Sequence, residues 1–145
     1  MTLAPALTRI AFDLGLGAHV AGVTSFCRLP PGERRPVVGS ALGPRVEPIL
    51  AVRPDLVLIQ MEPRHLEALA RLKPELPIEH FRLESLADVG EAMERIGRLA
   101  GAPETGVAAR ERFERLLEDT ARRTRGRPPH RALLVIGFQD PPGAG

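Results

Sequence analysis

Hydrophobic residues fall into short clusters along the chain, and their spacing alternates between that of helices and that of buried strands. The clearest unit covers residues 46–59, which read VEPILAVRPDLVLI. Its first half has helical spacing, and the helix is expected to stop at Arg53, because a residue before proline is pushed out of the helical region. Leu56 to Ile59 then runs without a polar break, which is typical of a short strand covered on both faces.

The same alternation precedes this unit. The pattern predicts a strand end at residues 2–4 and a helix that begins at Pro5, a residue favoured in the first helical turn. Short strands are predicted at residues 19–24 and 37–38. The segment between these two strands is rich in proline and charge, and it is expected to be a loop.

Three helices are predicted in the second half, each from apolar residues three or four apart. A strand at residues 77–81 follows the first helix. Ser85 is a good N-cap for the second, with Asp88 three residues on, and the third is a long polar helix over residues 104–125. The residues expected to face the core in these helices are Leu66, Leu69, Leu72, Leu86, Val89, Met93, Ile96, Ala100, Ala109, Phe113, Leu116 and Leu117. A last buried strand is predicted at residues 132–136.

These elements predict an α/β fold, a mostly parallel sheet with helices on both faces, plus one long helix and a final strand. Residues 1–102 are expected to form an α/β lobe, residues 103–127 the long helix, and residues 128–145 the last strand. A long solvated helix often bridges two bodies. The last strand therefore folds back on the first sheet, opens a second lobe, or pairs with another chain.

Composition and charge exclude several classes of function. The chain has 145 residues, 43% of them hydrophobic, and a formal net charge of +2, which suits one domain with a real core. Its charges are mixed along the helices rather than gathered in a basic block, so no nucleic-acid interface is expected. No apolar run approaches the roughly 20 residues of a membrane span, and no signal core is visible. As written, the chain is cytoplasmic, already mature, or part of a longer product.

Catalytic and metal-binding motifs are scarce. There is no nucleophile elbow and no phosphate-binding glycine loop. Cys27 is the only cysteine, so an internal disulfide and a cysteine metal cluster are excluded, and no base is placed beside its thiol. The histidines are scattered, although Met61 and His65 lie four residues apart across a turn and can in principle face a haem iron. The sequence therefore predicts binding without catalysis and without a cofactor.

Several strings, in order along nearly the whole chain, resemble the ABC-transporter solute-binding proteins that carry cobalamin, haem and ferric siderophores. Gly22 to Phe26, followed by Pro30-Pro31, resembles the family's G-V-[ST]-x-[YF] segment and its proline pair. Residues 46–57 resemble its most telling string, a glutamate ahead of a helix that ends in [LV]-[KR]-P-D-L-V. Residues 2–5 and 85–89 resemble the family's first strand and one of its later helices.

The resemblance implies an N-terminal lobe, a connecting helix and the first strand of a C-terminal lobe, with the ligand between the lobes. It implies a solute-binding component of an ABC importer, periplasmic or in the cell envelope, for a corrinoid, haem or ferric siderophore. The ligand-binding positions that it implies are Pro5, Phe26, Ala41, Leu42, Gln60 and Met61. Ala41 and Gln60 match positions where cobalamin binders can present tryptophan, so the sequence departs from that pattern. A cleft lined by these residues still suits a flat apolar ligand.

Glu47 is the partner-binding residue that the resemblance implies, docking onto arginines of the membrane permease. A carboxylate facing a guanidinium group makes a forked, charge-assisted pair that also fixes the register of two surfaces. From the residues alone, Glu47 is a surface charge placed favourably at the start of a helix, and it is the family resemblance that favours docking. Two other interpretations remain open: a stand-alone cytoplasmic module that has lost transport, and a small enzyme that uses Cys27.

Overall fold

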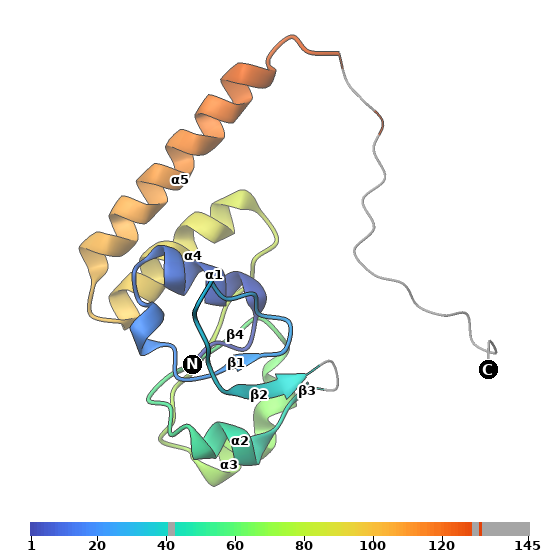
Figure 1. The fold of residues 1–145 in the computed structure, drawn as a ribbon, viewed down its shortest axis with the longest axis vertical. Helices are drawn as coiled ribbons and strands as arrows, with labels where there is room; N and C mark the ends of the chain where they lie inside the picture. The colour runs from blue at the N-terminus through green and yellow to red at the C-terminus, as the bar shows by residue number, and fades with distance from the viewer. Residues whose placement is uncertain (41–42, 129–130, 132–145) are drawn as a thin grey trace, which may run out of the picture.

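A computed structural model describes residues 1–40, 43–128 and 131, and it shows strands with helices on both sides (Figure 1). Two 3-10 turns, at Gly17–His19 and Pro63–Leu66, interrupt the connections. The helices and strands, in chain order, are α1 (Pro5–Asp13), β1 (Val23–Thr24), β2 (Val37–Ser40), β3 (Gly43–Pro44), α2 (Val46–Ala51), β4 (Val57–Ile59), α3 (Glu67–Leu72), β5 (Ile78–His80), α4 (Leu86–Leu99) and α5 (Pro103–Thr124).

The strands are mostly parallel, as predicted. β1 pairs in parallel with β2, β4 pairs in parallel with β5, and the short β3 pairs antiparallel with β2. Residues 1–3 connect the two groups: the Thr2 amide donates to the Gly22 carbonyl oxygen at 3.1 Å, and the Leu3 amide donates to the Leu58 carbonyl oxygen at 2.9 Å. From one side of the layer of strands to the other, the order is therefore β3, β2, β1, residues 1–3, β4 and β5. The strand order reverses between residues 1–3 and β4.

Side chains of β4 alternate between two cores, because successive residues of a strand point to opposite faces. Leu58 packs with α1 and α4, whereas Val57 and Ile59 pack with α2 and α3. All three side chains are buried, which confirms the strand predicted to be covered on both faces. Figure 1 shows the two helix pairs on opposite sides of the strands.

Several local predictions are confirmed and others are wrong. The Asp88 amide donates to the Ser85 hydroxyl at 3.1 Å and the Ser85 amide donates to the Asp88 carboxylate at 2.8 Å, the reciprocal cap that the sequence predicted. The strand predicted at residues 19–24 is limited to Val23–Thr24, because the 3-10 turn at Gly17–His19 occupies its start.

Four side chains predicted to face the core are exposed, because they lie where their helices extend past the body. Leu72 is the last residue of α3 and Leu86 the first of α4, with 62% and 60% of their surfaces exposed. Ala100 follows α4 and is exposed, and Leu116 lies on the distal half of α5, with 61% of its surface exposed. Helical spacing predicted which face of each helix is buried, but not how far along the helix other elements cover that face.

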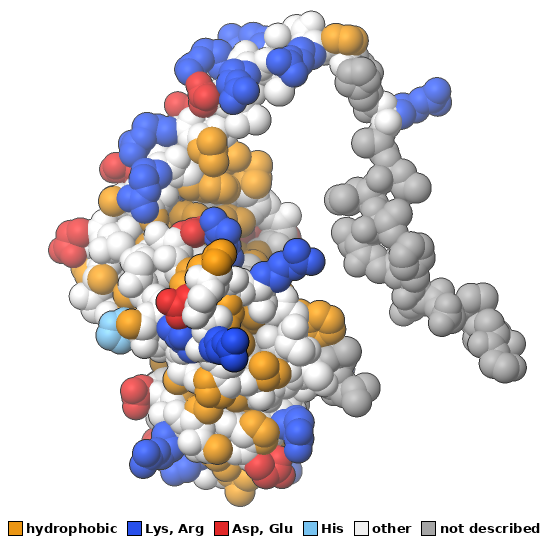
Figure 2. All heavy atoms as spheres, viewed as in Figure 1, with side chains coloured by type: hydrophobic (Ala, Val, Ile, Leu, Met, Phe, Trp, Pro, Cys, Tyr) orange, Lys and Arg blue, Asp and Glu red, His pale blue; other side chains and the backbone are white. Residues whose placement is uncertain are grey.

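The base of α5 packs directly on α4, backbone against backbone. A Cβ atom on Gly106 would lie 2.8 Å from the Met93 carbonyl oxygen, and one on Gly97 would lie 2.8 Å from the Gly106 Cα. Beyond this contact α5 runs clear of the body (Figure 1), and arginine side chains gather around its far end (Figure 2). The predicted strand at residues 132–136, and any pairing of two chains through it, lies outside the described residues.

None of the described helices combines the length and apolar character that crossing a bilayer requires.

Candidate ligand-binding groove

A groove of about 440 Å³ opens at the edge where the parallel strands end. Leu3 and Pro5 contribute from the end of the first segment, Phe26 from the loop after β1, and Met61 from the loop after β4. The full lining is Leu3, Pro5, Thr24, Phe26, Ser40, Gly43, Pro44, Met61 and His65, which we call the carboxyl-edge groove. It lies where the strand order reverses, and in open α/β sheets this is the crevice that receives ligands.

The groove brings together three of the residues that the sequence singled out. Pro5, Phe26 and Met61 come from separate loops and line one hollow. Phe26 has 57% of its surface exposed, so its ring is free to stack on a flat ligand. Gln60 is exposed beside Met61 but does not line the groove. Ala41 and Leu42 lie outside the described residues, and the ligand-binding role of all six positions stays a prediction.

His65 lines the groove although the family resemblance did not include it among the ligand contacts. The turn Pro63–Leu66 carries it, and its backbone amide donates to the Glu62 carbonyl oxygen at 3.1 Å. The sequence signal was its spacing of four residues from Met61. A spacing of four residues across a turn can bring two side chains near each other. It does not show which groove or pocket they line.

Hydroxyl groups surround Cys27 next to the groove. The Thr8 hydroxyl lies 3.0 Å from the Cys27 sulfur, and the Thr24 hydroxyl lies 3.2 Å from it. Thr8 is also 2.7 Å from the Thr2 hydroxyl, so these buried polar groups satisfy one another. No histidine or carboxylate among the described residues hydrogen-bonds to this thiol. An adjacent general base is a common activator of a nucleophilic cysteine, and the hydrogen-bond partners of this thiol among the described residues are hydroxyl groups.

Glu47 is exposed in the first turn of α2, three residues after the groove residue Pro44. It makes no ion pair with any described residue. Only Arg45 separates β3 from α2, so the predicted docking carboxylate lies close to the groove residue Pro44 along the chain.

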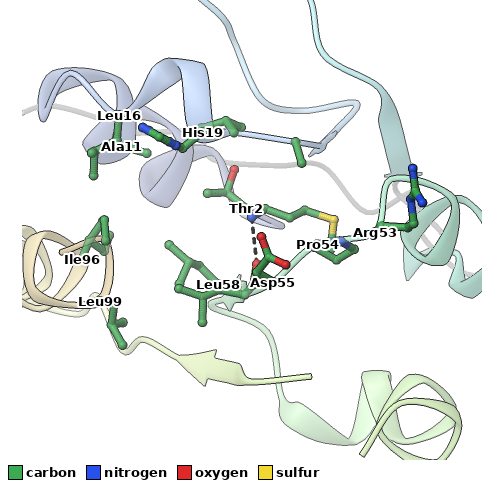
Figure 3. A pocket seen from close by; sticks show the side chains of 15 residues that line it. Thr2, Ala11, Leu16, His19, Arg53, Pro54, Asp55, Leu58, Ile96 and Leu99 are labelled. Atoms are coloured by element: carbon green, nitrogen blue, oxygen red, sulfur yellow. Dashed lines mark hydrogen bonds between the residues drawn. The ribbon is translucent and has the colours of Figure 1, made fainter. Parts of the chain in front are cut away.

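A second hollow of about 270 Å³ lies at the opposite edge, where the strands begin (Figure 3). Its polar wall includes His19, Arg53 and Asp55, and its apolar wall includes Ile96 and Leu99 of α4. We call this hollow the amino-edge pocket.

Met1 lines this pocket, and its amino group donates to the Leu56 carbonyl oxygen at 2.8 Å. Burial lowers the pKa of this amine, and the Asp55 carboxylate opposes part of that shift. The amino-edge pocket contains none of the residues predicted to bind ligand.

Comparison with known proteins gives a consistent picture. The family model described as periplasmic binding protein matches residues 1–145. The vitamin B12-binding protein of Pectobacterium atrosepticum is 27% identical over 148 residues, covering 96% of this chain and 52% of that protein. The vitamin B12-binding protein of Pectobacterium carotovorum subsp. carotovorum is 30% identical over 118 residues, covering 79% of this chain and 42% of that protein.

Solved structures share the fold. The periplasmic vitamin B12-binding protein of Vibrio cholerae superposes with a TM-score of 0.76 and 26% identity, over 88% of this chain and 51% of that one. A periplasmic haem-binding protein in complex with two haems gives a TM-score of 0.77 at 24% identity, over 88% and 50% of the two chains, and shows the fold alone.

The proteins matched are binding proteins rather than enzymes, and the chain spans about half the length of these relatives. The predicted α/β fold and the predicted family resemblance are confirmed. The division into residues 1–102, 103–127 and 128–145 stays a prediction. With its whole length matched by the family model, the chain belongs to the periplasmic binding protein family.

Proposed function

We propose that this chain is the ligand-binding lobe of a solute-binding component of an ABC importer, for a corrinoid, haem or ferric-siderophore type of ligand. One observation supports the proposal: Pro5, Phe26 and Met61, which the family resemblance assigned to ligand binding, line one groove at the carboxyl edge. The lining is largely apolar, and burial of a flat apolar surface is the main source of affinity in such sites. The protein binds and delivers its ligand without making or breaking bonds, in the periplasm or cell envelope.

Affinity is expected to depend on a second wall. The groove is lined by one lobe, and α5 runs clear of the body (Figure 1). The chain alone therefore binds weakly, because it covers one face of the ligand. Titration calorimetry of the chain with cyanocobalamin, iron protoporphyrin and a ferric hydroxamate tests this. Weak binding of one of them supports the proposal, a tight saturable complex refutes the need for a second wall, and binding of none contradicts the assigned ligand class.

Delivery depends on Glu47, which meets arginines of the permease. Replacement of Glu47 by arginine puts like charges face to face, and loss of a close interfacial charge pair typically costs about 2 kcal/mol or more, or about 30-fold in affinity. The measurement is binding of the natural product that contains this chain to its ABC permease in nanodiscs. Glu104→Arg is the matched control, since Glu104 is also an exposed first-turn glutamate. Equal binding by Glu47→Arg and the control would exclude Glu47 from docking.

A further inference from the structure

The far end of α5 carries more positive charge than the chain as a whole. Residues 120–131 contain no acidic residue and five arginines, which we call the distal arginine cluster: Arg122, Arg123, Arg125, Arg127 and Arg131. Without these five, 15 basic residues stand against 18 acidic ones, a net charge of −3, although the whole chain carries +2. The mixed charge expected along the helices therefore ends at Asp119, and such asymmetry indicates a surface for an anionic partner.

The cluster differs in its pairing from the arginines nearer the body. Arg110 pairs with Glu94 and Glu114, and Arg122 pairs with Asp119, the last acidic residue of α5. The other four arginines of the cluster are exposed, and none makes an ion pair or a side-chain hydrogen bond with a described residue. Figure 2 shows arginine side chains around this end of the helix. Four guanidinium groups are therefore available to an anionic partner, and each can bind two phosphate oxygens at once.

The helix dipole accounts for only part of the cluster. Cations in the last turn stabilise a helix, which explains the first two arginines. The dipole effect falls off within that turn, and α5 ends at Thr124. Arg125, Arg127 and Arg131 lie beyond the helix, so their positive charge needs another explanation.

The residues between the arginines indicate the kind of partner. Over residues 120–128 they are threonine, alanine, glycine and proline, with no aromatic or long aliphatic side chain. Specific protein interfaces are centred on buried aromatic or aliphatic anchors, which this segment lacks. A bilayer surface with anionic headgroups needs only charge, and clusters of about four to eight basic residues are typical of segments that bind it. The distal arginine cluster therefore suits a bilayer better than a protein.

We propose that the distal arginine cluster binds anionic phospholipid headgroups and holds the protein at a membrane surface. The inference rests on the proposed function, which puts the protein in the cell envelope beside its permease. Figure 1 shows the far end of α5 and α2, the helix that carries Glu47, at opposite ends of the molecule. The two contacts therefore use separate surfaces, and the lipid contact concentrates the protein near the membrane without covering the docking residue.

The test is flotation of the natural product that contains this chain with vesicles of phosphatidylcholine, with and without phosphatidylglycerol. Binding is expected only where phosphatidylglycerol is present. It should be lost when salt rises from about 0.1 M to about 1 M, because the Debye length falls from about 10 Å to about 3 Å. Equal binding to both kinds of vesicle, binding that salt does not weaken, or binding to neither would overturn the inference.

Paired substitutions test whether the cluster is the binding surface. Arg125→Gln with Arg127→Gln should weaken binding about 30-fold, at about fivefold for each arginine. Arg125→Lys with Arg127→Lys keeps the charge and should retain most of the affinity. The control, Arg28→Gln with Arg34→Gln, removes the same charge from two exposed arginines between β1 and β2 and should bind like wild type. An equal loss in the control or in the lysine pair would overturn the assignment to this charged cluster.

Separate measurements distinguish this inference from the function on which it rests. The glutamine pair should keep its affinity for the transported ligand and for the permease in neutral detergent, since neither residue lines the groove. Failure of the wild type to bind vesicles would overturn the lipid contact and leave the importer function standing. Absence of ligand binding would overturn that function and leave the vesicle result standing. Tighter binding of duplex DNA than of phosphatidylglycerol vesicles would overturn the lipid assignment.

Discussion

The carboxyl-edge groove and the junction of α4 with α5 are built in opposite ways. At the junction, Gly97 and Gly106 let two helix backbones touch, and an added Cβ atom would meet main-chain atoms at 2.8 Å. In the groove, Phe26 is 57% exposed, and the lining comes from loops. The junction is filled by the protein itself, whereas the groove leaves apolar and donor groups uncovered. This difference in packing distinguishes residues that stabilise the fold from residues that we propose bind the ligand.

Substitution at the junction should give the largest change in stability. Gly106→Ala places a methyl group against the Met93 carbonyl oxygen and the Glu94 Cα, which backbone atoms cannot vacate. Glycine to alanine in a helix usually stabilises by up to about 1 kcal/mol. Here we expect a loss of about 1–3 kcal/mol in the free energy of unfolding, typical of overpacking. Urea unfolding measures it, with Thr105→Ala as the exposed control. Equal stability of Gly106→Ala and wild type would show that the helices are not in close contact.

Substitution in the groove should change ligand affinity and little else. Phe26→Ala removes the exposed ring, and we expect about tenfold weaker binding of a flat ligand, which corresponds to about 1.4 kcal/mol. The free energy of unfolding should stay within about 0.5 kcal/mol of wild type, as for other surface positions. Leu99→Ala in the amino-edge pocket is the matched control. If Leu99→Ala weakened binding and Phe26→Ala did not, the ligand site would belong to the other edge.

The smallest effect concerns the start of α4, far from the groove. Backbone amides of Glu84 and then Ser85 donate to the Asp88 carboxylate and lower its pKa. A carboxyl whose pKa is lowered in the folded state stabilises above its unfolded pKa, near 3.9, and loses this effect as pH falls through the folded value. Asp88→Asn should therefore be less stable than wild type at pH 7, and the difference should shrink below about pH 4. Urea unfolding at pH 7, 5 and 3 measures it; a difference independent of pH would contradict the assignment.

Much of the fold could be predicted because local chemistry determined it. The unbroken apolar run of β4 and the Ser85 cap need only neighbours in sequence, and both are confirmed. The predicted burial of Leu72 and Leu86 was wrong, because helical spacing does not show where a helix extends past the body of the protein. The groove could be predicted only through family resemblance, since strand order brings Pro5, Phe26 and Met61 together. His65 was missed as a ligand contact for the same reason.

The three methionines offer a direct test of where the ligand binds, because each reports a different region. Met61 lines the carboxyl-edge groove, Met1 lines the amino-edge pocket, and Met93 is buried beside the α4–α5 junction. Methyl ¹³C labelling of methionine gives one NMR signal for each, and it detects weak complexes as well as tight ones. Titration with a flat chelate such as iron protoporphyrin, or its diamagnetic zinc analogue, should shift or broaden the Met61 signal and leave the other two in place. A shift of Met1 or Met93 with Met61 unchanged would contradict the assignment of the groove as the ligand site.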